Sequence, residues 1–475
     1  MSTELNDVQS RLNPSVVDRV VTPTTLKDLQ EVVRCAEIEN SVISIAGHMH
    51  SMGGQQFCDQ SLHLDLRNFD RVLRFDTENG HIDVESGIAW PALIKYLSEH
   101  QNAEQACWGI SQKQTGVDNV TIGGSRSSNI HGRGLHLPPF IHDIESFTLI
   151  NAGARMITCS RTENAELFSL VVGGYGMFGI VAHVRLRLAP RVKVQRQVEV
   201  IAVGDLIEKM EGRIKEGALY GDCQYSIHVH EEISPHPGIL SSYIPVLDST
   251  KVADNQKQLS EDDWGKLYRL ARTDKQKAFE AYAQYYLNTS GQVYWSDTHQ
   301  LSNVFKGYQD AVDVEYGTEM ITEVYVTKDA FVPFMAAVRA DFLKHEIDLI
   351  YGTIRLIKKD TESFLAWAKD DYICIVCNLH VEHTSSGIEK AKEDFRRIID
   401  KVIQYGGCFY LTYHKWATKE QITACYTQFV DFLKLKRTYD PSERFQSNWY
   451  RHYKEMFNLN RAVNKEKRGK VMGYE

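Results

Sequence analysis

Apolar positions in the first 190 residues alternate between the spacing of a helix and the spacing of a strand. Residues 26–39 show the helical pattern, with apolar residues every three or four positions after two threonines that suit a helix cap. The same pattern predicts helices at 90–100 and 163–172. Short apolar runs predict strands at 42–45, 61–66, 72–75, 82–86, 144–150 and 180–188.

Beyond Pro190 the pattern changes to longer strands and longer amphipathic helices. Strands are predicted at 320–326 and 372–381, and helices at 329–345, 387–405 and 419–434. This combination is typical of an α+β domain with an antiparallel sheet. The polar helical stretch 251–288 is predicted to be an insertion over a site, and the aromatic residues of 444–450 are expected to pack back on the first domain.

We therefore predict a two-domain α+β protein. Residues 1–190 form the first domain, residues 191–422 the second, and residues 423–475 a segment that returns to the first. More than one domain is expected because the chain has 475 residues, whereas a single hydrophobic core stops growing at about 250–300 residues.

Composition narrows the classes of function. Hydrophobic residues make up 43% and charged residues 24% of the chain, which is typical of a globular protein. The net charge of -8 argues against nucleic-acid binding, because that function requires clustered Lys and Arg. No apolar run reaches the roughly 20 residues of a membrane span or opens the chain as a signal peptide, so we expect a cytoplasmic protein without a transmembrane segment.

The cysteine pattern indicates core thiols. Nine cysteines are scattered along the chain, and Cys374 and Cys377 form the only near pair in the sequence. Their apolar surroundings predict a buried strand, in which residues three apart point to opposite faces. We therefore expect no metal site there and a reducing compartment.

Candidate chemistry appears at residues 44–54, which combine glycines with His48 and His50 after a predicted strand. Small residues leave backbone N–H groups free to approach a phosphate. The spacing matches neither G-x-x-x-x-G-K-[ST] nor G-x-G-x-x-G. Taken alone, the segment fits either a cradle for a nucleotide cofactor or a glycine-rich turn with incidental histidines.

Three segments together resemble the FAD-binding domain of vanillyl-alcohol-oxidase and p-cresol-methylhydroxylase-type flavoproteins. Residues 46–51 (Ala-Gly-His-Met-His-Ser) are similar to the pyrophosphate loop of alditol and sugar-lactone oxidases. Residues 120–134 resemble the second flavin loop, especially that of decaprenylphosphoryl-ribose oxidases, and 166–181 resemble the helix and turn around adenine and ribitol. The ending 440–447 also fits this family.

The resemblance implies that FAD lies between the two glycine loops of an N-terminal FAD-binding domain, with residues 191–422 as the substrate cap. The residues expected to contact the cofactor are Ala46, Gly47, His48, Met49, His50, Ser51, Gly123, Gly124, Ser125, Ser128, Asn129, Ile130, His131, Gly132, Gly174, Gly179, Ile180 and Val181.

A covalent flavin link is also implied by the resemblance. In that family a histidine followed by a serine carries the flavin, and His50 is in this position. His48 is the competing candidate, and non-covalent FAD is the remaining alternative. His131 is expected either to lie near the flavin ring or to have a structural role.

Catalytic residues are expected on the strands of the cap. Alditol oxidases resemble this chain in having an arginine at the position of Arg355, but their lysine corresponds to Tyr413. A neutral tyrosine can only hydrogen-bond where a lysine would stabilise negative charge. The other candidates for the site are His414, Lys415, Asn378 and His380.

The resemblance implies an FAD-dependent oxidoreductase that oxidises a hydroxyl group of a sugar, polyol or related small molecule by hydride transfer to flavin. Dioxygen or another acceptor would reoxidise the cofactor. One alternative is a dehydrogenase or reductase of a lipid-linked sugar or sterol-like substrate, with an apolar channel formed by Phe331, Val332, Phe334 and Met335. The other is a catalytically degenerate flavin-binding protein.

Overall fold

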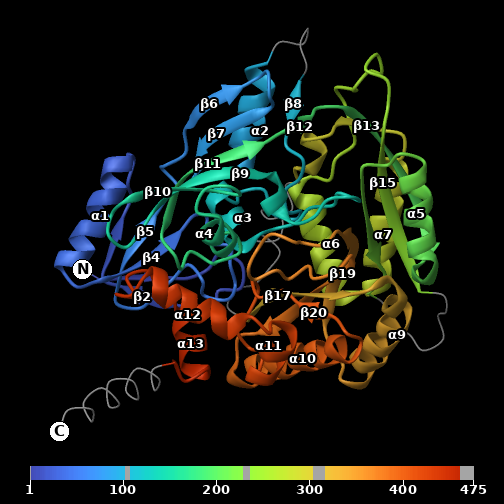
Figure 1. Cartoon of the computed structure of the whole chain (residues 1–475). Helices are drawn as coiled ribbons and strands as arrows, with labels where there is room; N and C mark the ends of the chain where they lie inside the picture. Colours follow the sequence, from blue (N-terminus) through green and yellow to red (C-terminus); the bar gives the residue numbers. More distant parts are fainter. Residues whose placement is uncertain (1, 102–106, 228–235, 303–315, 460–475) are drawn as a thin grey trace.

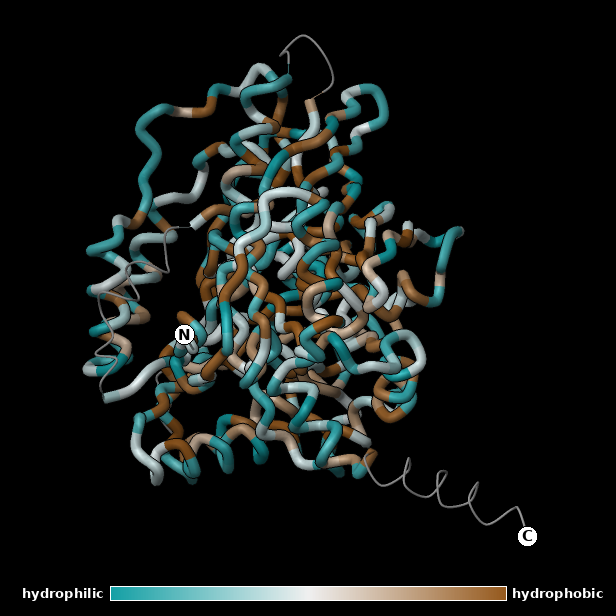
Figure 2. The backbone as a smooth tube through the Cα atoms, turned by 90° about the vertical axis from the view of Figure 1, so that its left-hand side faces the viewer, coloured by the Kyte–Doolittle hydropathy of each residue, from teal (hydrophilic) through white to brown (hydrophobic). Residues whose placement is uncertain are grey.

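The computed structural model describes residues 2–101, 107–227, 236–302 and 316–459. It combines helices with one parallel and several antiparallel sheets, as the predicted α+β class requires (Figure 1). Hydrophobic residues gather in the interior, and hydrophilic residues line the periphery (Figure 2). No helix among the described residues is both long and apolar enough to cross a bilayer.

A three-stranded parallel sheet stands near the N-terminus, in the order β3–β5–β4. Its strands are β3 (Arg19–Val21), β4 (Val42–Ala46) and β5 (Ser61–Asp65). Helix α1 (Leu26–Ile38) begins at Thr25, whose hydroxyl accepts from the Asp28 amide while the Asp28 carboxylate accepts from the Thr25 amide. Its apolar face packs on this sheet. The small hairpin β1 (Thr3–Leu5) and β2 (Ser15–Val17) precedes it.

A five-stranded antiparallel sheet in the order β10–β9–β11–β7–β6 completes this part of the molecule. Its strands are β6 (Val72–Asp76), β7 (His81–Glu85), β9 (Ile144–Ile150), β10 (Met156–Ser160) and β11 (Ile180–Arg187). The helices of this part are α2 (Trp90–Glu99), α3 (Ile122–Ser128) and α4 (Ala165–Val171), with a 3₁₀ turn at Phe140–Asp143. A two-stranded pair, β8 (Trp108–Gly109) with β12 (Ala189–Pro190), leads out of it.

An eight-stranded antiparallel sheet dominates the rest, in the order β16–β13–β15–β14–β18–β19–β17–β20. Its strands are β13 (Lys193–Ala202), β14 (Tyr220–Tyr225), β15 (Pro237–Pro245), β16 (Val293–Trp295), β17 (Gly317–Val326), β18 (Leu349–Ile357), β19 (Tyr372–Glu382) and β20 (Cys408–Phe409). Helices α9 (Lys328–Lys344) and α10 (Ser385–Gln404) pack against β17 and β19. Helices α6 (Glu261–Thr273) and α7 (Lys275–Asn288) pack against each other and against β18, β13 and β15. The remaining elements are α5 (Leu206–Lys215) and 3₁₀ turns at Val203–Asp205 and Thr298–Gln300.

The chain after α12 (Phe429–Tyr439) returns to the parallel sheet. Phe445 forms a parallel bridge with Ile43, and the Ile43 amide donates to the Arg444 carbonyl at 2.7 Å. The Arg444 guanidinium donates to the Ala36 carbonyl at the end of α1. Helix α13 (Asn448–Met456) then buries Trp449, so the aromatic end of the chain is part of the fold.

The predicted elements of the first 190 residues are confirmed, with ends that differ by two residues or fewer. Two predictions were wrong in detail. The single helix predicted at 419–434 is two helices, α11 (Lys419–Cys425) and α12, because Tyr426 leaves the helical conformation at φ −134° and ψ 76°. The second glycine loop contains α3, because Thr121 caps a helix there by accepting from the Gly124 amide.

Candidate active site

A large cavity lies between the two glycine loops and the eight-stranded sheet. Its empty volume, which includes space open to solvent, is about 1520 Å³. Residues of both loops line it, so two segments about 70 residues apart in sequence face one space. This is the arrangement expected for a dinucleotide held from two sides.

The first loop begins where β4 ends at Ala46. A Cβ atom on Gly47 would overlap the Thr121 side chain, so a glycine lets the first loop approach the start of α3. Met49 takes a left-handed conformation at φ 59°, and its carbonyl accepts from the Val8 amide at 3.1 Å. This turn places His48 and His50 on the wall of the cavity.

His50 is neutral at physiological pH. Burial lowers the pKa of its imidazole to about 4, and the nearby His48 adds to the shift. Burial also lowers the pKa of His48. A neutral imidazole keeps a nitrogen lone pair, which a nucleophile or a covalent linkage needs.

The backbone of the second loop is held to the chain that follows β7 of the antiparallel sheet. The Gly123 amide donates to the Ser86 carbonyl at 2.7 Å, and a Cβ on Gly123 would lie 3.0 Å from that oxygen. A Cβ atom on Gly124 would lie 3.1 Å from the Thr121 hydroxyl oxygen, so a side chain fits there almost as poorly as at Gly123. The narrow, side-chain-free surface is the kind that a cofactor backbone can approach closely.

The third predicted segment also reaches the cavity. Gly176 and Gly179 have φ of 74° and 149°, and a Cβ on Gly179 would lie 2.5 Å from the Ile150 carbonyl. Tyr175, which precedes Gly176 and has φ 51°, also lines the cavity. The three glycine segments form a cradle that side chains would fill, so the residues present fit FAD.

Most of the predicted cofactor residues border the cavity. Those that do are Ala46, Gly47, His48, Met49, His50, Ser51, Gly123, Gly124, Ser128, Ile130, His131, Gly179 and Val181. Those that lie behind its wall are Ser125, Asn129, Gly132, Gly174 and Ile180. Ser125 instead accepts from the Trp90 indole, and Asn129 donates to Asp360.

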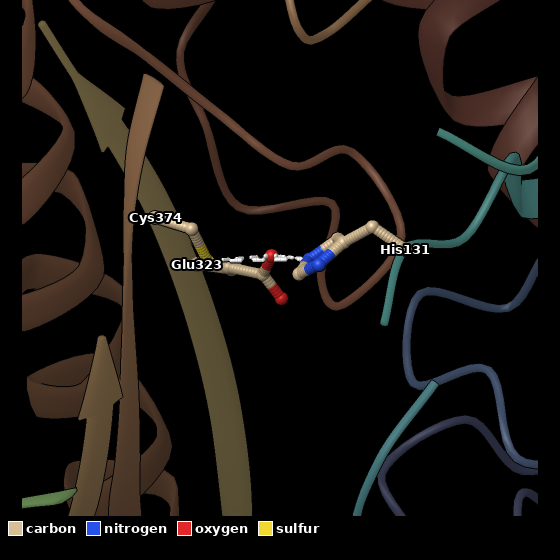
Figure 3. Close-up of side chains that lie close together, drawn as sticks. All are labelled: His131, Glu323 and Cys374. Atoms are coloured by element: carbon tan, nitrogen blue, oxygen red, sulfur yellow. Dashed lines mark hydrogen bonds and ion pairs between the residues drawn. The ribbon is translucent and has the colours of Figure 1, made fainter. Parts of the chain in front are cut away.

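A buried polar cluster stands opposite the second loop, where β17 and β19 face residue 131. The Glu323 carboxylate accepts from His131 and from the Cys374 thiol at 3.1 Å (Figure 3). It also accepts from the Tyr325 hydroxyl at 2.8 Å. Its second oxygen accepts from the Tyr413 hydroxyl at 3.0 Å. Glu323, His131 and Tyr413 all line the cavity.

Glu323 remains ionised although it is 1% exposed. Burial opposes its charge, but His131, Arg355 and the hydrogen bond from Cys374 outweigh burial and hold the pKa of the carboxyl at about 2. Burial likewise opposes the charge of Arg355, whereas Tyr351, Cys374 and other neighbours raise the pKa of its guanidinium. The cluster therefore places a buried anion and a buried cation on one wall.

Three residues of the cluster, a histidine, a glutamate and a cysteine, are of types that ligate metal ions. The ligand atoms of His131, Glu323 and Cys374 all lie within 4.8 Å of one another. Each already takes part in a hydrogen bond inside the cluster, which accounts for the arrangement without an ion. Cys374 and Cys377 pair with Arg355 and Gly352 on β18, so they are on opposite faces of the sheet, as predicted.

The predicted catalytic residues separate into two groups. Arg355 and Tyr413 line the cavity, and Arg355 donates to the Thr115 hydroxyl. His414 is 1% exposed and contacts Thr322 and the Phe395 ring, away from the cavity. Lys415 lies behind the first loop, with its ammonium near the Cβ position of Gly54.

A second cavity, of about 1250 Å³, adjoins the first. Six residues line both spaces: Gln9, Thr115, Val117, Ile321, Tyr351 and Arg355. Asn378 lines only the second cavity, whereas His380 lines neither and bonds to Glu319 at 3.3 Å. Arg355 thus stands at the junction of the two spaces.

Sequence reasoning missed Glu323, and it included Tyr175 and Gly176 only as part of the segment 166–181, without naming them as contacts. Glu323 had a detectable signal, because it is a carboxylate within the apolar run 320–326, and a buried charge in a strand requires a partner. Its partner, His131, lies 192 positions away. No local pattern indicates that distance.

Comparisons with known proteins agree with the geometry of the loops. Residues 17–160 match the family model described as an FAD binding domain. L-gulonolactone oxidase of Bos taurus is 25% identical over 199 residues, which cover 42% of this chain and 43% of that protein. D-arabinono-1,4-lactone oxidase of Debaryomyces hansenii is 28% identical over 203 residues, covering 40% and 35%. Cytokinin dehydrogenase 1 of Arabidopsis thaliana is 26% identical over 178 residues, covering 36% and 29%.

The chain spans less than half the length of each of these relatives. Their matches nevertheless agree with the family model and with the three glycine segments around one cavity. Residues 17–160 therefore match an FAD binding domain, and FAD is the cofactor that this match and the glycine-lined cavity support.

Proposed function

We propose that this protein is an FAD-dependent oxidoreductase that oxidises a CH–OH group of a sugar, polyol or related small molecule. The observation that carries the proposal is the buried His131–Glu323 pair on the cavity wall, beside Arg355. FAD, when bound, supplies the hydride acceptor for such a reaction. The chain must supply a proton acceptor and a group that stabilises the substrate oxygen.

The His131–Glu323 pair is the proposed proton acceptor. The two nearly buried groups share a hydrogen bond, so the Glu323 carboxylate orients the imidazole and would stabilise it once it has taken the substrate proton. Tyr413 holds the second oxygen of Glu323 in place. Arg355 would stabilise the negative charge that develops on the substrate oxygen as its proton leaves.

Tyr413 stands where the resemblance to alditol oxidases places a lysine, and it adds a hydrogen bond but no charge to the site. Its hydroxyl donates to an anion that already has His131 and Arg355 nearby. Burial raises the pKa of Tyr413 well above its usual value, which keeps it a neutral donor. In this proposal Arg355 alone supplies the positive charge at the substrate oxygen.

We further propose that His50 holds the flavin covalently. Its low pKa and its place on the wall support the linkage. Acid precipitation followed by mass analysis tests it, with flavin mass on a peptide that contains His50 as the expected result. Free FAD in the supernatant would contradict the assignment. So would flavin mass that remains on the His48 peptide in the His50→Ala variant.

The decisive experiment for the function is anaerobic reduction of the FAD-loaded protein by a panel of alditols, sugars and sugar lactones. We expect at least one compound to bleach the visible flavin absorbance, and dioxygen or an artificial acceptor to restore it. If dithionite bleaches the flavin but no compound of the panel does, the proposal is overturned in favour of a catalytically degenerate flavin-binding protein.

The apolar channel expected for a lipid-linked or sterol-like substrate has no support in the described residues. Phe331 and Phe334 lie on the buried face of α9, and Val332 lies on its exposed face. None of these residues, nor Met335, lines either cavity. We therefore propose the polar small-molecule reaction alone.

A further inference from the structure

The second cavity has a polar floor and an aromatic roof. The floor is one face of the eight-stranded sheet, because Gln224 pairs with Thr353 and Tyr351 pairs with Asn378 across neighbouring strands. Side chains of paired residues in antiparallel strands point to the same face. Asp222, two positions from Gln224, therefore also faces the cavity.

In the part of the chain that the structure describes, the floor contains an unpaired polar side chain and a charge that is already balanced. Asn378 is 3% exposed, and its side-chain oxygen has no hydrogen-bond partner among the described residues. A buried acceptor of this kind is costly unless something donates to it. Asp222 lies 3.9 Å from the Arg133 guanidinium, so its charge is already balanced and the floor does not favour a cation.

The roof consists of aromatic residues on α6 and α7. Trp264 and Tyr268 are one turn apart on α6, and Phe279, Tyr282 and Tyr286 lie on α7. All five are half-buried and border the cavity, so they do not fill a closed core.

The roof is arranged before any ligand enters. The rings of Tyr282 and Tyr286 stack with centroids 4.3 Å apart and an interplanar angle of 28°. The guanidinium of Arg196 lies over Tyr286 at 5.1 Å from the ring centroid and fixes its position. A preset aromatic wall favours a flat apolar partner, because stacking then costs little reorganisation.

We propose that the second cavity is the substrate chamber and selects a sugar or polyol that carries an aromatic ring. This inference rests on the function proposed above. The hydroxyl-bearing part lies on the floor, with Asn378 accepting and the reacting carbon toward Arg355. The aromatic ring lies against Tyr282 and Phe279. A bare polyol would offer no aromatic face to the rings of the roof and would lose the stacking contribution.

The test uses matched pairs of compounds with FAD-loaded, full-length protein. Phenyl and methyl β-glycosides of glucose, galactose and xylose differ only in the presence of the aromatic ring. Binding is followed by calorimetry in the absence of oxygen, and flavin reduction by loss of visible absorbance. We expect at least one phenyl glycoside to bind about tenfold or more tightly than its methyl partner.

Variants locate the effect. Phe279→Ala and Tyr282→Leu should each weaken phenyl-glycoside binding and reduce the phenyl preference to below about threefold. Gln284→Ala, on the exposed side of α7, is the matched control and should preserve the preference.

The outcomes separate the two proposals. Equal binding of every phenyl and methyl pair, absence of binding by all of them, or a preference that survives both variants would overturn the aromatic chamber. Tight phenyl binding that the variants abolish, without flavin reduction by any compound, would support the chamber and count against the proposed oxidation.

Discussion

The two sides of the flavin cavity are built in different ways. The FAD side uses three short segments in which glycines leave backbone exposed, at 46–54, 120–134 and 173–181. The opposite side uses single side chains from separate strands, such as Glu323 on β17 and Arg355 on β18. Cofactor binding therefore depends on local backbone shape, whereas the proposed chemistry depends on strand register.

The largest expected effect tests the sheet side. Glu323→Gln keeps the shape but removes the anion, and we expect kcat to fall by about 10²–10⁴-fold, the usual value of general acid–base catalysis. FAD content should stay the same, because Glu323 is not part of the glycine segments. Stopped-flow reduction with a reactive alcohol and the flavin-to-protein absorbance ratio measure the two quantities.

A matched control exists on the same sheet. Glu382 ends β19 and is exposed, so Glu382→Gln should leave kcat unchanged. A decrease of less than about threefold in Glu323→Gln would remove this residue from the mechanism.

The second prediction tests the loop side. Gly47→Val drives a branched side chain into Thr121, and overpacking of this kind costs about 1–3 kcal/mol. Because the first loop lines the cofactor cavity, we expect this strain to destabilise the FAD-bound state, so that FAD affinity decreases by roughly 10–100-fold. Titration with FAD measures the change in apoprotein that also carries His50→Ala, so that no covalent bond forms.

Gly212→Ala is the comparison for this variant. Gly212 lies in α5 with no atom within 4 Å of its Cβ position, so FAD affinity should not change. Equal affinity of Gly47→Val and the unmodified protein would show that the first loop does not contact the cofactor.

The third prediction links the two sides. His50→Ala should leave FAD bound without a covalent bond, lower the flavin potential and slow reduction roughly tenfold, equivalent to about 1.4 kcal/mol in the barrier. The thermal unfolding midpoint of the FAD-binding domain should be retained. If the peptide no longer carries flavin mass but the reduction rate is unchanged, the covalent bond has no role in catalysis.

The smallest expected effect concerns acid stability. Burial lowers the pKa of His63 to about 4, below its value of 6.5 in an unfolded chain, and His63 bonds to Ser44 at 2.9 Å. The unfolded state therefore binds the proton first, and stability falls as pH decreases through 6.5 toward the folded pKa. This residue should cost about 1 kcal/mol of unfolding free energy between about pH 7 and about pH 5.5.

Urea unfolding at the two pH values measures that slope. His63→Gln should be less stable at neutral pH but should lose about 1 kcal/mol less on acidification than the unmodified protein. An identical slope in both proteins would assign the acid sensitivity to other groups, such as His414, whose pKa burial lowers to about 3.

Sequence patterns predicted the helices and strands well because their signals are local. The capping pair Thr25 and Asp28, for example, is three residues apart, and both groups act within one helix turn. The single helix predicted at 419–434 was wrong because the apolar period continues across the break at Tyr426. Periodicity reports which face is buried and not whether the backbone bends.

Asn378 and His414 illustrate the limit for the site. Both were candidates from their place on or beside a predicted strand, yet Asn378 faces the second cavity and His414 packs on Phe395. A shift of one position moves a strand side chain to the other face. Proximity to a motif therefore does not settle orientation.

The order of amino acids was sufficient to reveal the FAD-binding domain, because glycine segments encode the backbone shape that receives a dinucleotide within a few consecutive residues. The meeting of His131, Glu323, Cys374 and Arg355 arises from folding alone. Pairing of β17 with β19 and of β19 with β18 brings the strand residues to one face. The packing of that face against the second loop then encloses a charge pair that no stretch of sequence contains.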